Sequence, residues 1–217
     1  MKTYSVKEAY VTLQGEGAQT GRAAVFLRFA GCNLWTGLER DRTKAVCQFC
    51  DTDFVGTDGE NGGKFSGAEA LADHVAALWA RDDRAQGVPG YVVCTGGEPL
   101  LQLDAPLIDA LKQRGFEIGV ETNGTVRAPE GLDWVCVSPK ANAGLVQTEG
   151  DELKLVYPQA EPEAQPERFE MLQFRHFFLQ PKDDNRQADN IAAAAAYCMK
   201  HPKWRLSLQT HKLIGLP

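Results

Sequence analysis

The feature that most constrains the fold is a series of short apolar segments separated by few helices. Eight of these segments are predicted to be β-strands, because they are short apolar runs bounded by glycine, proline or polar turn residues. Most follow one another as strand, connection and parallel strand, which is the pattern of an α/β sheet. The predicted strands are EAYVTLQ (8–14), AAVFLRFAG (23–31), YVVC (91–94), FEIGVET (116–122), WVCVSP (134–139), ELKLVYP (152–158), RHFFLQP (175–181) and WRLSLQT (204–210).

Three helices are predicted between these strands. Ser66 and Glu69 form an S-x-x-E capping box that opens the first helix. Asp104 caps the second, which ends at Gly115, and an Ala-rich stretch over 189–201 forms the third. Three helices are too few for a complete eight-unit barrel, and 217 residues lie near the lower size limit of one. We therefore expect one α/β domain over 1–217, a shortened, open TIM-type barrel with functional groups at the C-terminal ends of its strands.

Composition and charge exclude several classes of protein. The formal net charge is −6 and the isoelectric point about 5.3, which argues against a broad nucleic-acid-binding face. No apolar run approaches the roughly 18 residues of a membrane span, and the first ten residues lack the apolar core of a signal peptide. We expect a cytoplasmic protein that binds neither nucleic acid nor membrane. Its cysteines should then stay reduced and serve metal binding or catalysis.

Three of the six cysteines lie in one polar loop over 31–65 that follows a predicted strand. Cys47 and Cys50 form a CxxC pair, and fourteen residues separate Cys32 from Cys47. This loop is predicted to bind a cluster or metal. The other three cysteines lie in apolar strands or in the Ala-rich helix and are expected to be small buried apolar side chains: Cys94, Cys136 and Cys198.

A set of three thiols differs from the common closed metal sites. Structural zinc normally has four ligands in two pairs, and the sequence has no second CxxC and no paired histidines. A cubane iron–sulfur cluster contains four irons that each take an external ligand. Three thiolates leave one iron open, which suits a cluster that binds a substrate. The sequence therefore indicates such a cluster, and a chance grouping of unrelated thiols is the alternative.

Further motifs complete a resemblance to a known family. The three-cysteine loop, followed by TGGEP at the end of a strand, resembles the radical S-adenosylmethionine enzymes, whose usual spacing is CxxxCxxC. The longer spacing here changes the shape of the loop but not the number of thiols, since loop-closure cost grows slowly with length. Within that superfamily the chain resembles the 7-carboxy-7-deazaguanine synthases of queuosine and 7-deazapurine biosynthesis. The strings that carry this resemblance are LQGEG (13–17), FLRFAGC (26–32), CDT (50–52), TGGEP (95–99), ETNG (121–124) and SPK (138–140), in that order.

The resemblance implies a radical S-adenosylmethionine lyase with three cofactors. Cys32, Cys47 and Cys50 would hold a [4Fe-4S] cluster whose open iron binds S-adenosylmethionine. Thr52 would give one oxygen ligand to Mg²⁺, which prefers oxygen ligands. Paired glycines in TGGEP would let the backbone approach the cofactor closely. The implied cofactor contacts are Phe49, Cys50, Asp51, Gly97, Glu98, Ser138, Pro139, Lys140 and Gln180.

The substrate implied by the resemblance is 6-carboxy-5,6,7,8-tetrahydropterin, which is converted to 7-carboxy-7-deazaguanine with loss of ammonia. No side chain is expected to act as a catalytic group, because the radical comes from the cofactor. Arg28 is the only charge in its apolar strand, and a guanidinium there suits the substrate carboxylate. The resemblance also implies a homodimer and an electron donor such as a flavodoxin or ferredoxin. The implied substrate contacts are Leu13, Gln14, Gly15, Glu16, Arg28, Thr95, Asn123 and the terminal carboxylate of Pro217.

Two alternatives remain open from the sequence. A glycyl-radical activating enzyme would share the thiols and the glycine turn, but it would act on a protein partner and would not need Arg28. A zinc-binding interaction module would combine the three thiols with His74 or another distant ligand. The four histidines are scattered and unpaired, so each is expected to serve packing or the surface: His74, His176, His201 and His211.

Overall fold

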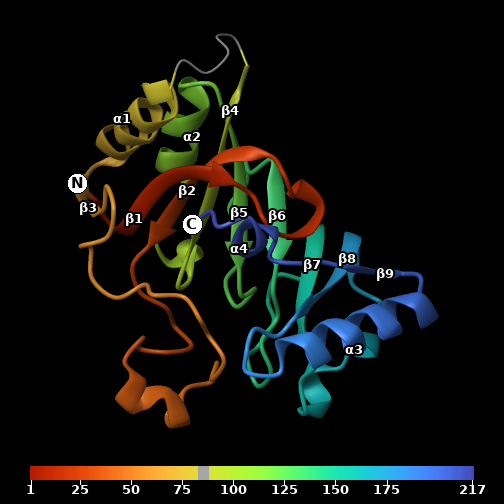
Figure 1. The fold of residues 1–217 in the computed structure, drawn as a ribbon. Coiled ribbons are helices and arrows are strands. Elements are labelled where there is room, and N and C mark those ends of the chain that lie inside the picture. The colour runs from red at the N-terminus through yellow and green to blue at the C-terminus, as the bar shows by residue number, and fades with distance from the viewer. Residues whose placement is uncertain (83–87) are drawn as a thin grey trace.

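The computed structural model describes residues 1–82 and 88–217 (Figure 1). Within these residues, no helix combines the length and apolar character needed to cross a bilayer. Short 3₁₀ turns occur in several of its loops. The strands are β1 (Thr3–Leu13), β2 (Ala23–Phe29), β3 (Gly63–Ser66), β4 (Gly90–Gly96), β5 (Phe116–Thr122), β6 (Trp134–Val137), β7 (Glu149–Tyr157), β8 (Gln173–Pro181) and β9 (Trp204–Leu206). The α-helices are α1 (Ala68–Trp79), α2 (Ala105–Gln113), α3 (Gln187–Lys200) and α4 (Thr210–Leu213).

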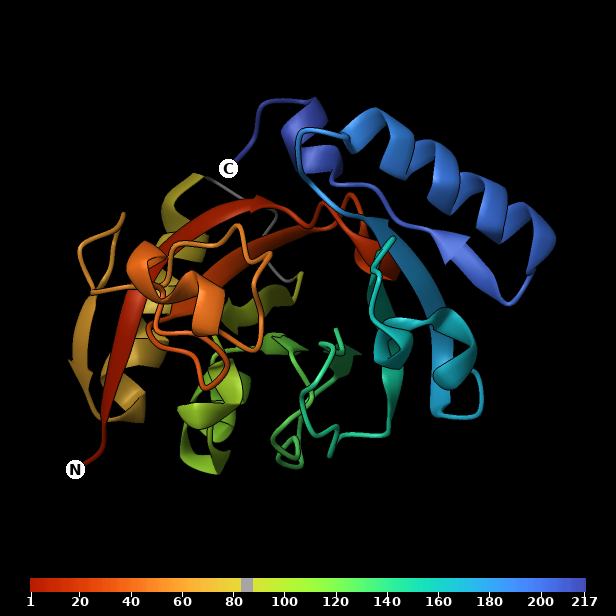
Figure 2. The same ribbon diagram turned by 90° about the horizontal axis from the view of Figure 1, so that it is seen from below.

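The described strands form one mixed sheet in the order β3-β1-β2-β4-β5-β6-β7-β8-β9. β1 is antiparallel to both β2 and β3, and all neighbouring pairs from β2 to β9 are parallel. The two edge strands, β3 and β9, do not pair with each other, and Figure 2 shows the curved sheet as an open arc. The expectation of an open, partial barrel with few helices is therefore confirmed.

Two apolar cores hold the sheet from its outer face. The first lies between the α1–α2 pair and β1, β2, β4 and β5, where Leu27, Leu71 and Leu107 are fully buried. The second lies between α3 and the strands β7, β8 and β9 and contains Leu155 and Trp204. No helix connects β5 to β6 or β6 to β7, as the sequence predicts. Most apolar side chains of these strands therefore turn outward to the helices. The inner face of the arc carries polar groups beside a small apolar cluster of Ala24, Phe26, Tyr91 and Val93.

The alternation along β7 shows this division most clearly. Leu153 and Leu155 are fully buried in the second core. Glu152 and Lys154 alternate with them, so they project to the inner face. Lys154 is only 5% exposed there. A lysine and a carboxylate buried in this way mark the inner face as a polar site.

The prediction that Ser66 caps the first helix is wrong. Ser66 is the last residue of β3 and pairs with Thr3 of β1. Gly67 is the N-cap instead, with φ of +92° and no side-chain cap. The capping box describes local preference, but strand pairing with β1 fixes the backbone of Ser66 before the helix begins. The predicted polar loop therefore contains an edge strand at its end.

The last predicted strand is shorter than expected. β9 ends at Leu206, and the chain turns away from the sheet into α4. The turn is fixed by Ser207, whose hydroxyl accepts from the Gly17 N–H at 2.9 Å and donates to Gln180 at 2.7 Å. Thr210 N–H then donates to the Gly15 carbonyl at 2.9 Å. These tertiary bonds bring the C-terminal segment over the inner face of the sheet.

Candidate active site

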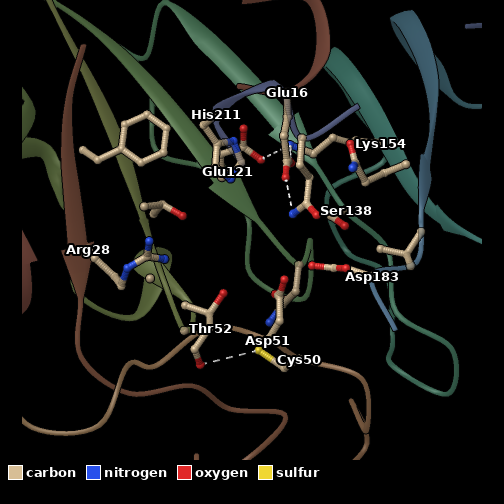
Figure 3. Close-up of a pocket in the computed structure, with 18 of the residues that line it drawn as sticks. Glu16, Arg28, Cys50, Asp51, Thr52, Glu121, Ser138, Lys154, Asp183 and His211 are labelled. Atoms are coloured by element: carbon tan, nitrogen blue, oxygen red, sulfur yellow. Dashed lines mark hydrogen bonds and ion pairs between the residues drawn. The ribbon is translucent and has the colours of Figure 1, made fainter. Parts of the chain in front are cut away.

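A cavity of about 440 Å³ opens on the inner face of the sheet. This volume is within the usual range of small-molecule sites. Its walls come from the C-terminal ends of β4, β5, β6, β7 and β8, from the cysteine loop and from the C-terminal segment. Figure 3 shows Glu16, Glu121 and Lys154 at one end of this cavity and Cys50, Asp51 and Thr52 at the other. The position agrees with the expectation that functional groups lie at the strand ends.

The three loop thiols lie close enough to influence one another. Burial raises the pKa of Cys32 and of Cys47, and the neighbouring Cys50 thiol raises both further. Two features oppose this rise: the Leu34 N–H donates to Cys32 Sγ at 3.4 Å, and Lys140 lowers the pKa of Cys47. Metal ligation requires thiolates. A cluster of thiols beside the partly buried Lys140 therefore fits an iron–sulfur cluster, whose iron would stabilise the thiolates.

The second glycine of TGGEP packs directly against the cysteine loop. A Cβ at Gly97 would lie 2.2 Å from the Gly31 carbonyl oxygen and 2.8 Å from Cys32 Cβ. The next residue, Glu98, donates its N–H to the same Gly31 carbonyl at 2.9 Å. Gly96 has φ of +141° and equally close contacts with the Phe29 backbone. The paired glycines thus position the first thiol of the loop, Cys32, as well as exposing backbone to the cavity.

The insertion between the first two cysteines is folded. It contains a 3₁₀ helix over Glu39–Lys44, from which Arg42 reaches back to the CxxC turn. Its guanidinium donates to the Gln48 carbonyl at 2.9 Å and the Cys50 carbonyl at 3.1 Å. The same group lies 4.1 Å from the ring centroid of Trp35. The insertion therefore supplies a cation that fixes the backbone of the turn carrying two of the thiols.

The arrangement gives no support to a mononuclear zinc site. No group of three His, Cys, Asp or Glu side chains in residues 1–82 and 88–217 surrounds a single-ion position. His74 Nε2–H donates a 2.9 Å hydrogen bond to the Asn61 carbonyl, and its ring packs on Phe65. In a cubane cluster each thiolate binds a different iron, so convergence on one point is not required. Three thiols without a converging fourth group fit the cluster better.

The Glu98 carboxylate is hydrogen-bonded to groups of the protein itself. It is fully buried and accepts from the Thr122 hydroxyl at 2.7 Å, the Asn123 N–H at 2.8 Å and the Leu100 N–H at 3.0 Å. Burial raises the pKa of Glu98, and these donors oppose the rise. Its side chain joins the ends of β4 and β5 and does not line the cavity. Glu98 therefore lies behind the residues of the cavity wall that are predicted to contact the cofactor.

Arg28 lies on the cavity wall near the middle of the sheet. β2 has a neighbour on each side, so Arg28 is not on an edge strand. Its Nε donates to Glu8 at 2.8 Å and one terminal nitrogen donates to the Tyr10 hydroxyl at 3.2 Å. These partners keep the pKa of Arg28 high against the effect of burial. The guanidinium is therefore held in one orientation with a terminal nitrogen left for a ligand.

The opposite end of the cavity is a floor of acidic side chains around one buried lysine. Lys154 Nζ lies 2.6 Å from Glu16 Oε2 and 2.7 Å from Glu121 Oε2. Glu121 also accepts from the Gln14 amide at 3.1 Å. Burial would raise the pKa of Glu16, but Lys154 outweighs it and holds that pKa below its usual value. The floor presents carboxylate oxygens of the kind that accept bonds from ligand N–H groups.

The C-terminal segment closes one side of the cavity. Gln209 donates to Glu16 at 2.9 Å, and the Thr12 hydroxyl donates to the terminal residue Pro217 at 3.1 Å. His211 packs so closely on Gly15 that a Cβ there would lie 1.9 Å from the ring Nδ1. Burial lowers the pKa of His211, which favours its neutral form. The glycine of LQGEG is thus required by the approach of this histidine.

The cavity gathers most of the residues that the sequence singled out. Five do not line it: Leu13, Gly15, Cys32, Glu98 and Pro139. The predicted residues that do line it are Gln14, Glu16, Arg28, Cys47, Phe49, Cys50, Asp51, Thr52, Thr95, Gly97, Asn123, Ser138, Lys140, Gln180 and Pro217.

Sequence reasoning missed several lining residues. The expectation that His211 serves packing or surface does not describe its place at the cavity. Lys154 shares with Arg28 the pattern of a single cation in an apolar strand, which is the one sequence feature that indicates it. Glu121 stands in the ETNG string next to the predicted Asn123. Gly96, the first of the paired glycines expected to approach the cofactor, also lines the cavity. The lining residues that were not predicted are Glu8, Tyr10, Phe26, Asp53, Glu121, Thr122, Lys154, Val156, Pro181, Lys182, Asp183, Gln209, His211 and Lys212.

An open, mostly parallel sheet whose strand ends and three-cysteine loop face one polar cavity is the architecture of the radical S-adenosylmethionine class. Proteins named 7-carboxy-7-deazaguanine synthase are 64% identical in Caulobacter vibrioides and 62% identical in Bradyrhizobium diazoefficiens. Both alignments cover 99% of this chain and at least 99% of the relative. The crystal structure of QueE from Escherichia coli is 29% identical, with a TM-score of 0.69 over 95% of this chain and 94% of that one. No protein-family model matches the sequence.

The chain therefore belongs to the 7-carboxy-7-deazaguanine synthases, and it is an enzyme. Identity at this level over the full length favours this family over the glycyl-radical activating enzymes and the zinc-binding module. The ordered strings in the sequence thus led to the correct family.

Proposed function

We propose that this chain converts 6-carboxy-5,6,7,8-tetrahydropterin to 7-carboxy-7-deazaguanine by ring contraction with loss of ammonia, in queuosine and 7-deazapurine biosynthesis. The observation that carries the proposal is one cavity with thiols at one end, an acidic floor for the polar edge of the pterin at the other, and Arg28 on the wall for its carboxylate. Membership of the synthase family supports the reaction class, which is that of a carbon–nitrogen lyase.

Cys32, Cys47 and Cys50 are proposed to hold a [4Fe-4S] cluster. When bound, the cluster and S-adenosylmethionine would supply the radical chemistry needed for hydrogen-atom abstraction at C6 of the substrate. The protein's task is to hold the reacting centre and exclude competing reactions. The wall of Gly97, Ser138 and Lys140 would bind the cofactor beside the thiols, with Phe49, Asp51 and Gln180 as further contacts.

The substrate is proposed to lie across the cavity between Arg28 and the acidic floor. A planar guanidinium with a free terminal nitrogen suits a carboxylate. Gln14, Glu16 and Glu121 would accept from, or donate to, the polar edge of the pterin, with Thr95, Asn123 and the Pro217 carboxylate nearby. Neutral His211 lies beside Glu16 and is placed to hold or accept a proton from a ring nitrogen.

Thr52 is proposed to supply one oxygen to Mg²⁺, with substrate and water completing its shell. Thr52 lines the cavity two residues after Cys50. The protein is further proposed to act in the cytoplasm as a homodimer and to take electrons from a flavodoxin or ferredoxin.

The test is turnover by the anaerobically reconstituted protein. The enzyme is incubated with a reductant, S-adenosylmethionine, Mg²⁺ and the pterin, and products are analysed by mass spectrometry. We expect 7-carboxy-7-deazaguanine and ammonia in equal amounts. A protein with a full complement of iron and sulfide that forms neither product would contradict the proposal.

A further inference from the structure

The floor of the cavity gathers three carboxylates around one buried lysine. Glu16, Glu121 and Glu152 lie around Lys154, the buried cation that the described structure places among them. An ion pair buried in this way is costly unless both partners are held by further bonds. The pairing of two carboxylates with one lysine must therefore be offset by a role of this arrangement.

Each of the two paired carboxylates uses both of its oxygens. Glu16 accepts from Lys154 on one oxygen and from Gln209 on the other, at 2.9 Å. Glu121 accepts from Lys154 on one and from Gln14 on the other, at 3.1 Å. Lys154 therefore ties together two side chains from different elements, one in the loop after β1 and one in β5. Both remain about 20% exposed toward the cavity.

The third carboxylate behaves differently. Glu152 accepts from the Ala18 N–H at 2.9 Å, and the Cys136 thiol lies 3.6 Å from its other oxygen. A Cβ on Gly17 would lie 1.9 Å from the carboxylate, so the loop that carries Glu16 docks on this side chain. Burial raises the pKa of Glu152. Glu152 thus anchors the loop, and Lys154 serves the two carboxylates that face the cavity.

We propose that Lys154 is a positioning residue that keeps Glu16 and Glu121 ionised together, so that both accept hydrogen bonds from N–H groups of the bound heterocycle. This inference rests on the proposed function and adds the residue that controls recognition of the pterin edge. Without the cation, two like charges share a partly dry site, and one carboxylate takes up a proton. That carboxyl then loses an acceptor oxygen for the ligand.

Several charged or titratable groups face this cluster. His211 from α4 faces Glu16, and Cys136 and Tyr91 face Glu121 from β6 and β4. Burial raises the pKa of both Cys136 and Tyr91, so neither is expected to ionise between pH 6 and 9. His211 and Glu152 are the neighbours whose ionisation must be separated from that of Glu16 and Glu121, since burial raises the pKa of Glu152.

The test compares pterin affinity of the wild type and of Lys154→Gln from pH 6 to 9. Both proteins carry the reconstituted cluster but no S-adenosylmethionine, so binding is measured by anaerobic calorimetry without turnover. Ionisation of the pterin is common to both and cancels in the ratio of the two dissociation constants. We expect K154Q to bind about tenfold more weakly at pH 6, because one charge-assisted bond is lost, and to recover toward wild-type affinity as the carboxyl ionises at higher pH.

Three further proteins sharpen the outcome. Lys154→Arg keeps the cation and should show no new ionisation. Lys112→Gln, at an exposed pair with Asp133, should match the wild type. The comparison repeated in a His211→Asn background and in a Glu152→Gln background should give the same pH-dependent ratio, which assigns it to Glu16 and Glu121.

A ratio that is constant with pH would overturn the inference, as would a new ionisation in K154R. If K154Q does not fold, K154R decides the question: no new ionisation and at most a few-fold loss supports the proposal. Failure of the wild type itself to bind the pterin would instead refute the proposed function. The two failures are therefore distinguishable.

Discussion

The two ends of the cavity are held together in different ways. At the floor, a lysine that is 5% exposed binds two carboxylates, and the surrounding amides complete their bonds. At the cysteine end, the thiols have few protein partners, and the loop is fixed by Arg42 and by close packing on Gly97. The floor is organised before any ligand binds, whereas the cysteine loop is arranged so that a cluster can complete it.

This difference predicts that damage to the two ends separates binding from chemistry. Lesions in the cysteine loop should remove turnover and leave pterin affinity nearly intact. Lesions in the floor should weaken affinity and leave the cluster in place.

The largest effect is expected for Cys50→Ser. Loss of one of three thiolates should abolish both the iron–sulfur absorption and turnover, because serine is a poor ligand for iron. Cys198→Ser in α3, far along the chain from the loop, is the matched control and should keep iron content and activity. Iron analysis together with product formation measures both. Normal turnover by C50S would show that this thiol is not a ligand.

A smaller but still large effect is expected for Gly97→Ala. Its Cβ would meet the Gly31 carbonyl at 2.2 Å, so the loop must move, at a cost of about 1 to 3 kcal/mol. We expect cluster content and turnover to fall together, while the midpoint of thermal unfolding changes by a few degrees. Gly144→Ala is the control, since a Cβ there has nothing within 4 Å. Equal cluster content and equal turnover in the two variants would show that Gly97 does not position the cysteine loop.

Arg42→Ala should weaken the loop without destroying it. The substitution removes two bonds to the carbonyls of Gln48 and Cys50 and the contact with Trp35. We expect about 1 to 2 kcal/mol less local stability and faster loss of iron to a chelator. Arg40→Ala, at a side chain that is 80% exposed, is the control. Identical rates of iron loss in the two variants would show that Arg42 does not stabilise the CxxC turn.

The smallest effect is expected for Lys212→Ala. Lys212 joins Asp51 at 3.1 Å and also pairs with Asp183, which links the C-terminal segment to the rim of the cavity. The side chains are 32% to 50% exposed, so the pairs should contribute at most about 1 kcal/mol. We expect a small rise in KM that disappears at high salt. A loss of more than tenfold that persists in salt would mean that Lys212 contacts the ligand.

The sequence predicted the features that local pattern determines. The order of short apolar segments and the scarcity of helices were enough to predict an open α/β barrel. The thiol spacing together with the ordered strings was enough to identify the family. Ser66 shows the limit of local reasoning, because its pairing with Thr3 across the sheet prevailed over a good capping sequence.

The site residues that were missed depend on tertiary contacts. His211 reaches the cavity only because Ser207 and Thr210 bond to the loop after β1, and nothing in HKLIGLP predicts that docking. The pairing of Lys154 with Glu16 and Glu121 joins three elements that are far apart in sequence. Lys154 alone was accessible to sequence reasoning, as a single cation among apolar strand residues.

The most direct test of the account concerns the fourth iron of the proposed cluster. The protein is reconstituted anaerobically with enriched iron, and Mössbauer spectra are recorded before and after adding S-adenosylmethionine. We expect four irons held by the three loop thiols, of which one changes its spectrum when the cofactor binds. Four irons that are all unaffected by the cofactor would show that the protein closes the cluster itself, and the account would be wrong.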